Sequence, residues 1–151
     1  GTKPEYIRDT VELLRKVGIS SLVYFLIGLP GETRETIQET VDFAKQINPD
    51  YVEFYPATPY PGTEFFDIAH AENLIVDSNW DNYMCGGQFV IEIPGLKKGE
   101  LEEILRKAYR KFYLRPAYAW ILFKRAVRPA EFLRLMSFGF GYFRRFLSPT
   151  N

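Results

Sequence analysis

The segment Val23-Tyr-Phe-Leu-Ile-Gly-Leu-Pro-Gly-Glu-Thr33 decides the fold of this chain. It begins inside the stretch Ile19 to Leu29, which lacks polar alternation and is rich in β-branched and aromatic residues. That pattern predicts a parallel strand that is buried on both faces. Pro30-Gly31 predicts a turn, and the apolar spacing from Glu32 to Ile47 predicts an amphipathic helix.

The residues on either side of this segment extend the same pattern. Thr2-Lys-Pro-Glu5 has the spacing of a helix start with Thr2 as its cap, and that helix is expected to stop at Gly18. Tyr51 to Ala57 predicts the next strand. The order helix, strand, helix, strand with short connections predicts one right-handed βαβ unit, and therefore a parallel sheet.

Beyond the second strand the chain is expected to become mostly helical. The predicted elements are a short helix over Thr63 to Glu72, an extra strand over Phe89 to Ile93, a helix whose apolar positions include Leu101, Ala108 and Phe112, a helix opened by Pro116, and a helix from Pro129 to about Leu147.

Composition limits the classes of protein to which the chain can belong. Its 151 residues are 46% hydrophobic, enough for one full core, and Cys85 is the single cysteine. One cysteine excludes an internal disulfide framework and any multi-cysteine metal or iron-sulfur site made within this chain. The sequence shows neither a secretion signal nor an apolar run long enough to span a bilayer. A cytoplasmic protein is the expectation.

Two loops leave the predicted strands at the same edge of the sheet, where parallel α/β folds bind ligands. They are Gly-Leu-Pro-Gly-Glu after the first strand and Pro-Ala-Thr-Pro-Tyr-Pro-Gly-Thr after the second. Gly28 and Gly31 would let a ligand approach the backbone, and amides near Glu32 would receive an anionic or polar group. A Pro-Gly turn without a ligand stays an open alternative. Neither a Walker P-loop nor Gly-x-Gly-x-x-Gly is present.

Strand alternation sorts the side chains onto two faces. One face is expected to carry Tyr24, Leu26 and Gly28 from the first strand and Tyr51, Glu53, Tyr55 and Ala57 from the second. A carboxylate in the middle of a parallel strand is costly to bury dry. Glu53 is therefore expected to face a hydrated cavity or a cation, or to lie on an edge strand in solvent.

The stretches FLIGLPGET, ETIQETVDFAKQINPDYVEFYPATPYPGTEFF and ELEEILRKAYRKFYLRP together resemble the carboxyl-terminal part of radical S-adenosylmethionine enzymes. The resemblance is to the group with a cobalamin-binding domain, which includes methyltransferases and anaerobic magnesium-protoporphyrin monomethyl ester cyclases. It covers roughly residues 1 to 128. It implies an α/β fold: the last two strands, with their helices, of a partial (β/α)6 barrel, followed by a helical carboxyl-terminal extension.

The resemblance also implies site residues. The family motif Gly-x-Ile-x-Gly-x-x-Glu on the fifth strand corresponds to Tyr24, Leu26, Gly28 and, after the inserted Pro30, Glu32. Its apolar residue, Leu26 here, packs on the adenine of S-adenosylmethionine. Backbone groups at the end of the sixth strand meet the adenine edge, and the matching positions are Tyr55, Pro56 and Ala57. Glu53 and Tyr24 would face substrate inside the barrel, and Cys85 is a further, weaker candidate.

The family's Cys-x-x-x-Cys-x-x-Cys loop, whose thiolates hold the [4Fe-4S] cluster, is absent, and so is the cobalamin-binding domain. We therefore expect a fragment that forms the adenosine-side wall and substrate cap of such an oxidoreductase or methyltransferase. Alone it would not be a competent enzyme and would bind no cofactor or metal. Its partner would be the N-terminal half of the parent enzyme, with self-association through an exposed strand edge. Residues 1–95 would belong to the barrel and 96–151 to the helical extension.

Residues 115–151 carry 7 of the chain's Lys and Arg residues but a single Glu, interleaved with aromatic residues. Three roles for this tail stay open: packing on the barrel, binding a membrane surface through residues 116–147, and binding nucleic acid. We expect no nucleic-acid binding, because the rest of the chain is acidic. A peripheral place at the inner membrane face is one expectation. The alternative function is a standalone interaction module whose tail binds a membrane or a protein.

Overall fold

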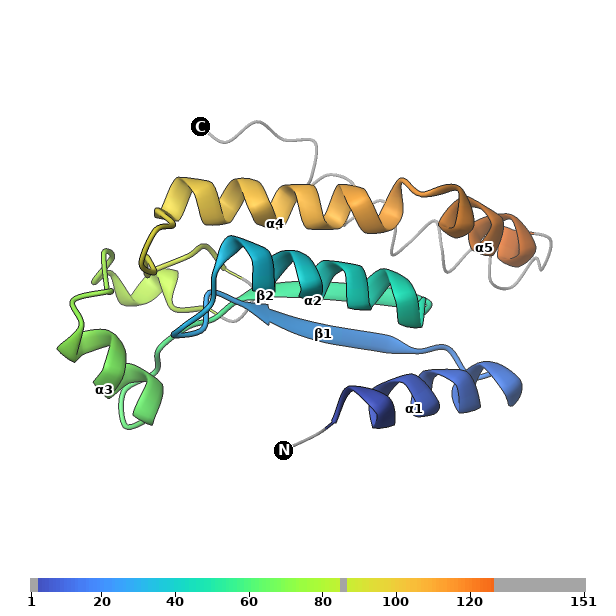
Figure 1. The fold of residues 1–151 in the computed structure, drawn as a ribbon, viewed down its shortest axis with the longest axis horizontal. Helices are drawn as coiled ribbons and strands as arrows, with labels where there is room; N and C mark the ends of the chain where they lie inside the picture. Colours follow the sequence, from blue (N-terminus) through green and yellow to red (C-terminus); the bar gives the residue numbers. More distant parts are fainter. Residues whose placement is uncertain (1–2, 85–86, 127–151) are drawn as a thin grey trace. The chain divides into compact units, whose positions relative to one another are not determined.

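The computed structural model describes residues 3–84 and 87–126, and the chain divides into two compact units, Gly1–Phe112 and Tyr113–Asn151. The first unit holds α1 (Pro4–Lys16), β1 (Leu22–Ile27), α2 (Arg34–Ile47), β2 (Tyr51–Pro56), α3 (Glu64–Ala71), the 3-10 helix η1 (Trp80–Asn82) and α4 (Lys98–Tyr113), which ends at the boundary; α5 (Pro116–Ala126) lies in the second unit (Figure 1). The helix predicted from Pro129 to Leu147 lies outside the described residues.

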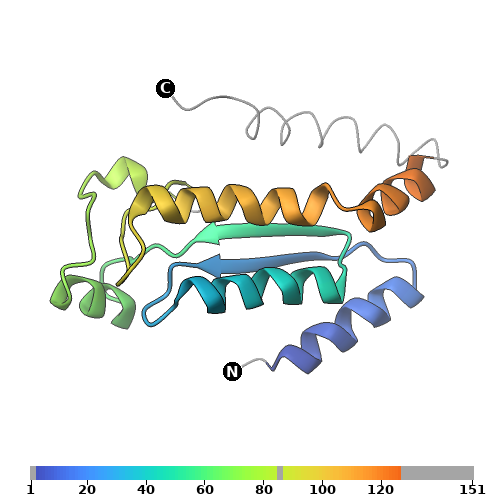
Figure 2. The same cartoon turned by 45° about the horizontal axis from the view of Figure 1, so that its top comes forward.

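The predicted βαβ unit is confirmed. β1 and β2 form a parallel two-stranded sheet in which Leu22 is paired with Tyr51 and Ile27 with Pro56. Figure 2 shows the two strands side by side, with α2 next to β1 and α4 next to β2. The unit is α/β, as expected, while the partial barrel stays a prediction. The predicted boundary between residues 95 and 96 also stays a prediction.

The core lies on one face of this sheet. Phe25 of β1 and Phe54 of β2 stack with ring centroids 5.6 Å apart, and each ring also meets a helix edge-on. Phe43 of α2 contacts Phe25, and Tyr109 of α4 contacts Phe54. On α2 the predicted apolar face is confirmed, since its buried residues are Ile37, Val41, Ala44 and Ile47.

The opposite face of β1 is uncovered in the part of the chain that the structure describes. Leu22, Tyr24 and Leu26 are 43%, 58% and 51% exposed. The expectation that this strand is buried on both faces is therefore wrong for the described residues. The physical reason is that the helices whose rings contact the sheet, α2 and α4, both lie on its other face.

The two edges of the sheet also differ. Tyr51 N–H donates to the Ser21 carbonyl at 2.9 Å and Ala57 N–H to the Ile27 carbonyl at 2.7 Å, so alternate residues of β2 point their backbone groups toward β1. Phe54 points outward, and the Tyr109 hydroxyl bonds both its N–H and its carbonyl. Pro56, also outward, has no N–H to offer. The outer edge of β2 is thereby closed.

Side chains fix the beginnings of the two strands. Asp50 Oδ2 accepts hydrogen bonds from the Ser21 N–H at 2.7 Å and from the Ser21 hydroxyl at 3.1 Å, and that hydroxyl accepts from the Asp50 N–H at 3.1 Å.

Lys3 is the N-cap of α1 and makes no side-chain cap bond, so the prediction of Thr2 as the cap is wrong; Thr2 itself lies outside the described residues. After α1 the chain turns at Gly18, which has φ +75°.

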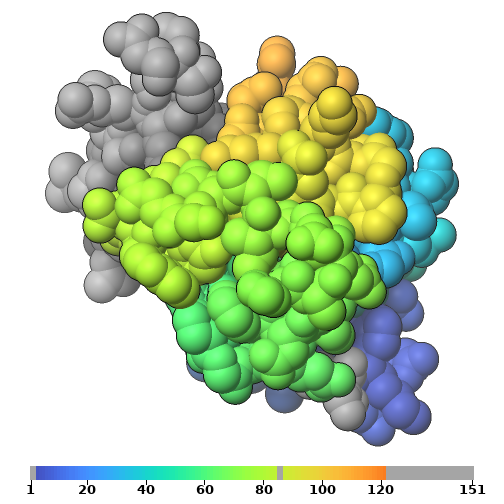
Figure 3. Space-filling model, turned by 90° about the vertical axis from the view of Figure 1, so that its left-hand side faces the viewer, coloured from blue at the N-terminus to red at the C-terminus, as the bar shows by residue number. Residues whose placement is uncertain are grey.

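Residues 58–84 and 87–97 cover the end of the unit at which the strands end, as the green to yellow atoms of Figure 3 show. The strand predicted over Phe89 to Ile93 is wrong. In the described residues this stretch forms isolated bridges, Ile75 with Ile91 and Ile93 with Leu96. Its apolar side chains fill the core from an irregular backbone, because Phe89, Val90 and Ile91 are fully buried.

Candidate functional site

The loop after β1 uses its own side chains to bond its amides. Glu32 Oε2 accepts hydrogen bonds from the Gly28 N–H at 2.6 Å and from the Leu29 N–H at 3.0 Å. At the start of α2, Thr33 and Thr36 exchange side-chain to backbone hydrogen bonds as a capping box. The Gly28 and Leu29 N–H groups therefore already donate to Glu32, which gives Glu32 a structural role. Its cofactor role stays a prediction.

Gly28 is required by its neighbours within the chain. Its φ is +96°, which side chains rarely adopt, and a Cβ there would lie 3.2 Å from Phe89 Cε1. Gly31 has φ +81° but no atom within 4 Å of a Cβ position. Close packing by Phe89 thus accounts for glycine at position 28, and ligand contact at this position stays a prediction.

Four predicted residues meet on the uncovered face of the sheet. The register places Tyr24 beside Glu53 and Leu26 beside Tyr55, as the alternation predicts. The rings of Tyr24 and Tyr55 stack, with centroids 5.6 Å apart and planes 13° apart. The Tyr55 hydroxyl donates to Glu53 Oε2. Two aromatic rings, an aliphatic side chain and a carboxylate therefore form one surface.

The backbone at the end of β2 is largely engaged. The Ala57 N–H donates to Ile27 of β1, and the Pro56 carbonyl accepts a bond from the Thr58 hydroxyl at 3.4 Å. Ala57 is 2% exposed. The predicted adenine contacts of Tyr55, Pro56 and Ala57 stay predictions.

A polar network that sequence patterns did not indicate orders the segment before α4. Asp77 accepts bonds from the Asn79 N–H at 3.0 Å, from Asn82 Nδ2 at 2.9 Å and from Lys98 Nζ at 3.4 Å. The Asn79 bond, followed by those of Asn82 and Lys98, outweighs burial and lowers the pKa of Asp77. Burial, reinforced by the Asp77 charge, raises the pKa of Tyr83 nearby. No spacing in the sequence distinguishes these residues from ordinary loop residues.

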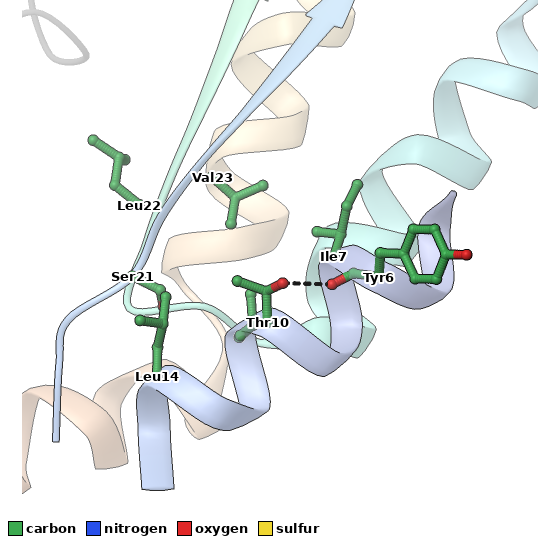
Figure 4. A pocket seen from close by; sticks show the side chains of 8 residues that line it. Tyr6, Ile7, Thr10, Leu14, Ser21, Leu22 and Val23 are labelled. Atoms are coloured by element: carbon green, nitrogen blue, oxygen red, sulfur yellow. Dashed lines mark hydrogen bonds between the residues drawn. The ribbon is translucent and has the colours of Figure 1, made fainter. Parts of the chain in front are cut away.

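A pocket of about 220 Å³ lies between α1 and the start of β1, and its lining residues are Tyr6, Ile7, Thr10, Val11, Leu14, Ser21, Leu22 and Val23 (Figure 4). The Thr10 hydroxyl donates to the Tyr6 carbonyl at 2.6 Å, and Ser21 is bonded to Asp50. The remaining lining is mostly apolar. The pocket is at the opposite end of β1 from the Gly28 loop and is therefore separate from the predicted site.

Among the described residues no group of three or more His, Cys, Asp or Glu side chains could hold a metal ion. Cys85 lies outside the described residues, and so does most of the basic aromatic tail. The membrane surface predicted for residues 116–147 therefore stays a prediction. No helix within 3–84 and 87–126 is long and apolar enough to cross a membrane.

The chain is similar to several curated proteins. It is 40% identical over 116 residues to an uncharacterised methyltransferase of Pyrococcus horikoshii, a match that covers 77% of this chain and 25% of the relative. It is 29% identical over 116 residues to the anaerobic magnesium-protoporphyrin IX monomethyl ester cyclase of Cereibacter sphaeroides, covering 75% of this chain and 18% of the relative.

The bacteriochlorophyllide d C-12(1)-methyltransferase of Chlorobaculum tepidum is 27% identical over 139 residues, which are 92% of this chain and 29% of that protein. The resemblance to the carboxyl-terminal part of radical S-adenosylmethionine enzymes is confirmed. No protein-family model matches the chain. The matched region spans about a quarter or less of the two relatives named first.

Proposed function

We propose that this chain forms the adenosine-side wall and substrate cap of a cobalamin-dependent radical S-adenosylmethionine enzyme of the methyltransferase or iron-sulfur oxidoreductase type. The observation that carries the proposal is the uncovered face of the β1–β2 sheet. In a chain related to methyltransferases and a porphyrin ester cyclase, that face presents Leu26 and Tyr55 side by side. The remaining strands of the parent barrel would enclose this face.

Leu26 supplies the apolar contact for the adenine. It is 51% exposed on the uncovered face, where a flat ring could cover it. Gly28 and Glu32 act indirectly: the glycine lets Phe89 pack beneath the loop, and the carboxylate holds the Gly28 and Leu29 amides. When bound, S-adenosylmethionine supplies the methyl group or the adenosyl radical. The iron-sulfur cluster must be held by another part of the parent protein, since a cluster needs several thiolates and this chain has one cysteine.

The partner that this proposal requires is the remainder of the parent enzyme, docked on β1. By the alternation of the parallel ladder, the backbone groups of Leu22, Tyr24 and Leu26 point away from β2. The opposite edge is closed by Tyr109 and Pro56. A further strand would therefore join at β1, and α1 has the place in the chain of the crossover helix between that strand and β1. Without it, the open edge favours self-association.

A chimera tests the proposal. The segment of the Pyrococcus horikoshii methyltransferase that matches this chain is replaced by the corresponding residues of this chain, and the iron-sulfur cluster is reconstituted without oxygen. Binding of S-adenosylmethionine is then measured by equilibrium dialysis. We expect Leu26→Ala to weaken binding about tenfold, because removing a buried leucine side chain costs on the order of 1.5–3 kcal/mol. The matched control is Leu13→Ala, since Leu13 is 60% exposed on α1.

Equal binding by the Leu26 and Leu13 variants would show that β1 does not contact the adenosine. If the chimera fails to bind S-adenosylmethionine while the Pyrococcus horikoshii protein with its own segment binds it, this chain cannot replace the matching segment of its relative.

A further inference from the structure

Glu53 carries the only charge in the two strands of the described sheet. No charged residue occurs from Ile19 to Leu29, and none besides Glu53 occurs from Tyr51 to Ala57. The side chain is half-buried and lies on the uncovered face. It is not a member of the ion pairs Arg34–Glu100, Lys45–Asp42, Lys98–Asp77 and Lys107–Glu103. The carboxylate is thus a negative charge on an otherwise apolar and aromatic surface.

The residues around Glu53 are held in place. The Tyr55 hydroxyl donates to Oε2 of the carboxylate, while Oε1 accepts no hydrogen bond from a described residue. Tyr24, beside Glu53 in the sheet, stacks on the Tyr55 ring with the planes 13° apart. The stack limits the rotation of both rings, so one carboxylate oxygen and two aromatic surfaces are presented together.

We propose that Glu53, Tyr55 and Tyr24 form a binding site for the cationic group of an organic substrate, such as an amine, an amidine or a guanidine on an apolar body. A carboxylate attracts a cation and repels an anion, and tyrosine rings bind cations through their negative faces. The uncovered leucines beside the cluster suit the apolar body. Enclosing this face inside the parent enzyme would strengthen the attraction between the carboxylate and a cation, because charges interact more strongly where water is excluded.

The assignment of the cation to a substrate rests on the proposed function, which puts this face inside a barrel. The affinity of the cluster for a cation does not, since it depends on residues of this chain alone. The two can therefore fail separately. The probe is benzamidinium, an aromatic cation, and its neutral counterpart is benzamide, which has nearly the same shape. Both are titrated into the full 151-residue chain while the ring signals of Tyr24 and Tyr55 are followed by NMR.

We expect benzamidinium to shift both ring signals with millimolar affinity, and benzamide to shift them much less. Glu53→Gln, which keeps the shape and can still accept from Tyr55, is expected to weaken benzamidinium binding about threefold or more. Glu12→Gln, an exposed glutamate on α1, is the matched control and should leave it unchanged. Raising the salt concentration to 1 M should mimic Glu53→Gln, because salt screens the charge. Unchanged amide spectra would establish that the variants are folded.

Equal shifts by benzamide and benzamidinium, or equal binding by the Glu53→Gln and Glu12→Gln variants, would overturn the cation site. Tighter binding of S-adenosylmethionine than of benzamidinium, lost in Glu53→Gln, would overturn the assignment to a substrate and give the carboxylate to the cosubstrate. The isolated chain could bind benzamidinium as expected while the chimera fails to bind S-adenosylmethionine. That result would support the cation site of Glu53, Tyr55 and Tyr24 and contradict the proposed function.

Discussion

The hydroxyl group of Tyr109 bonds both backbone groups of Phe54, accepting from the N–H at 3.0 Å and donating to the carbonyl at 3.1 Å. A helix side chain thus takes the place that a neighbouring strand would have at this point of β2. The sheet is left with one edge that can be extended and one that cannot.

Tyr109→Phe should destabilise the first unit by about 1–3 kcal/mol, because it leaves a buried N–H and carbonyl without a partner. Urea unfolding followed by far-UV circular dichroism measures the change. Tyr6→Phe is the control, since Tyr6 is 59% exposed on α1. A Tyr109 variant as stable as the Tyr6 variant would mean that water replaces the hydroxyl without cost.

The open edge of β1 predicts self-association of the isolated chain. Leu22, Tyr24 and Leu26 are exposed there, and neither a charge nor a proline protects the strand. Leu22→Lys should shift the chain toward monomer, as measured by size-exclusion chromatography with light scattering. Leu13→Lys adds the same charge on α1 and should not. A wild-type chain that is monomeric at high concentration would contradict the open edge.

Gly28→Ala should be more destabilising than Gly31→Ala. Both positions have positive φ, which costs an ordinary residue on the order of 1–2 kcal/mol. At position 28 the new methyl group would also lie 3.2 Å from the Phe89 ring, whereas at position 31 it would meet no atom. The difference between the two midpoints of thermal unfolding therefore reports the contact. Equal midpoints would show that Phe89 moves aside freely.

The sequence predicted those features that repeat along the chain. The period of α2 identified its four buried residues, and the alternation in β1 and β2 put Tyr24 and Glu53 on one face. A single contact between residues far apart in the sequence leaves no repeating pattern from which it could be predicted. The bond from Tyr109 to Phe54 and the packing of Phe89 under Gly28 join positions more than fifty residues apart, and nothing local marks either pair.

The apolar composition of β1 and of residues 89–93 led to two wrong predictions, burial of β1 on both faces and a strand over residues 89–93, for two different reasons. Leu22 and Leu26 are apolar although nothing described covers them, so apolar character alone did not show that the face was covered. Phe89 and Ile91 are apolar because they fill a core, and burial of side chains requires no strand. Apolar character alone therefore shows neither which element a residue belongs to nor whether its face is covered.

The Asp77 network predicts a dependence of stability on pH. Its hydrogen bonds lower the pKa of Asp77 in the folded state, so its contribution is present above the unfolded pKa of about 3.9 and is lost as the pH falls through the lower folded pKa. Asp77→Asn should therefore be less stable than wild type at pH 7, and the gap should close at low pH. Urea midpoints across this range measure it, with Asp9→Asn on α1 as control. A gap that is independent of pH would contradict the role of the charge.

The isolated chain should show no detectable binding of S-adenosylmethionine in titration calorimetry. Under the proposed function, the cluster and the other strands around the cosubstrate belong to the rest of the parent enzyme, and the Gly28 and Leu29 amides are already bonded to Glu32. Micromolar affinity would show that the two strands and their loops form a complete site by themselves.

The internal bonding of the loop after β1 determines where a ligand could be observed. Glu32 already protects the Gly28 and Leu29 N–H groups, so their hydrogen exchange should be slow before any cosubstrate is added. In a reconstituted enzyme, these amides would be poor reporters of occupancy despite lying in the most recognisable motif. The informative probes are the methyl groups of Leu26 and the ring protons of Tyr55, which lie on the surface that a ligand would have to touch.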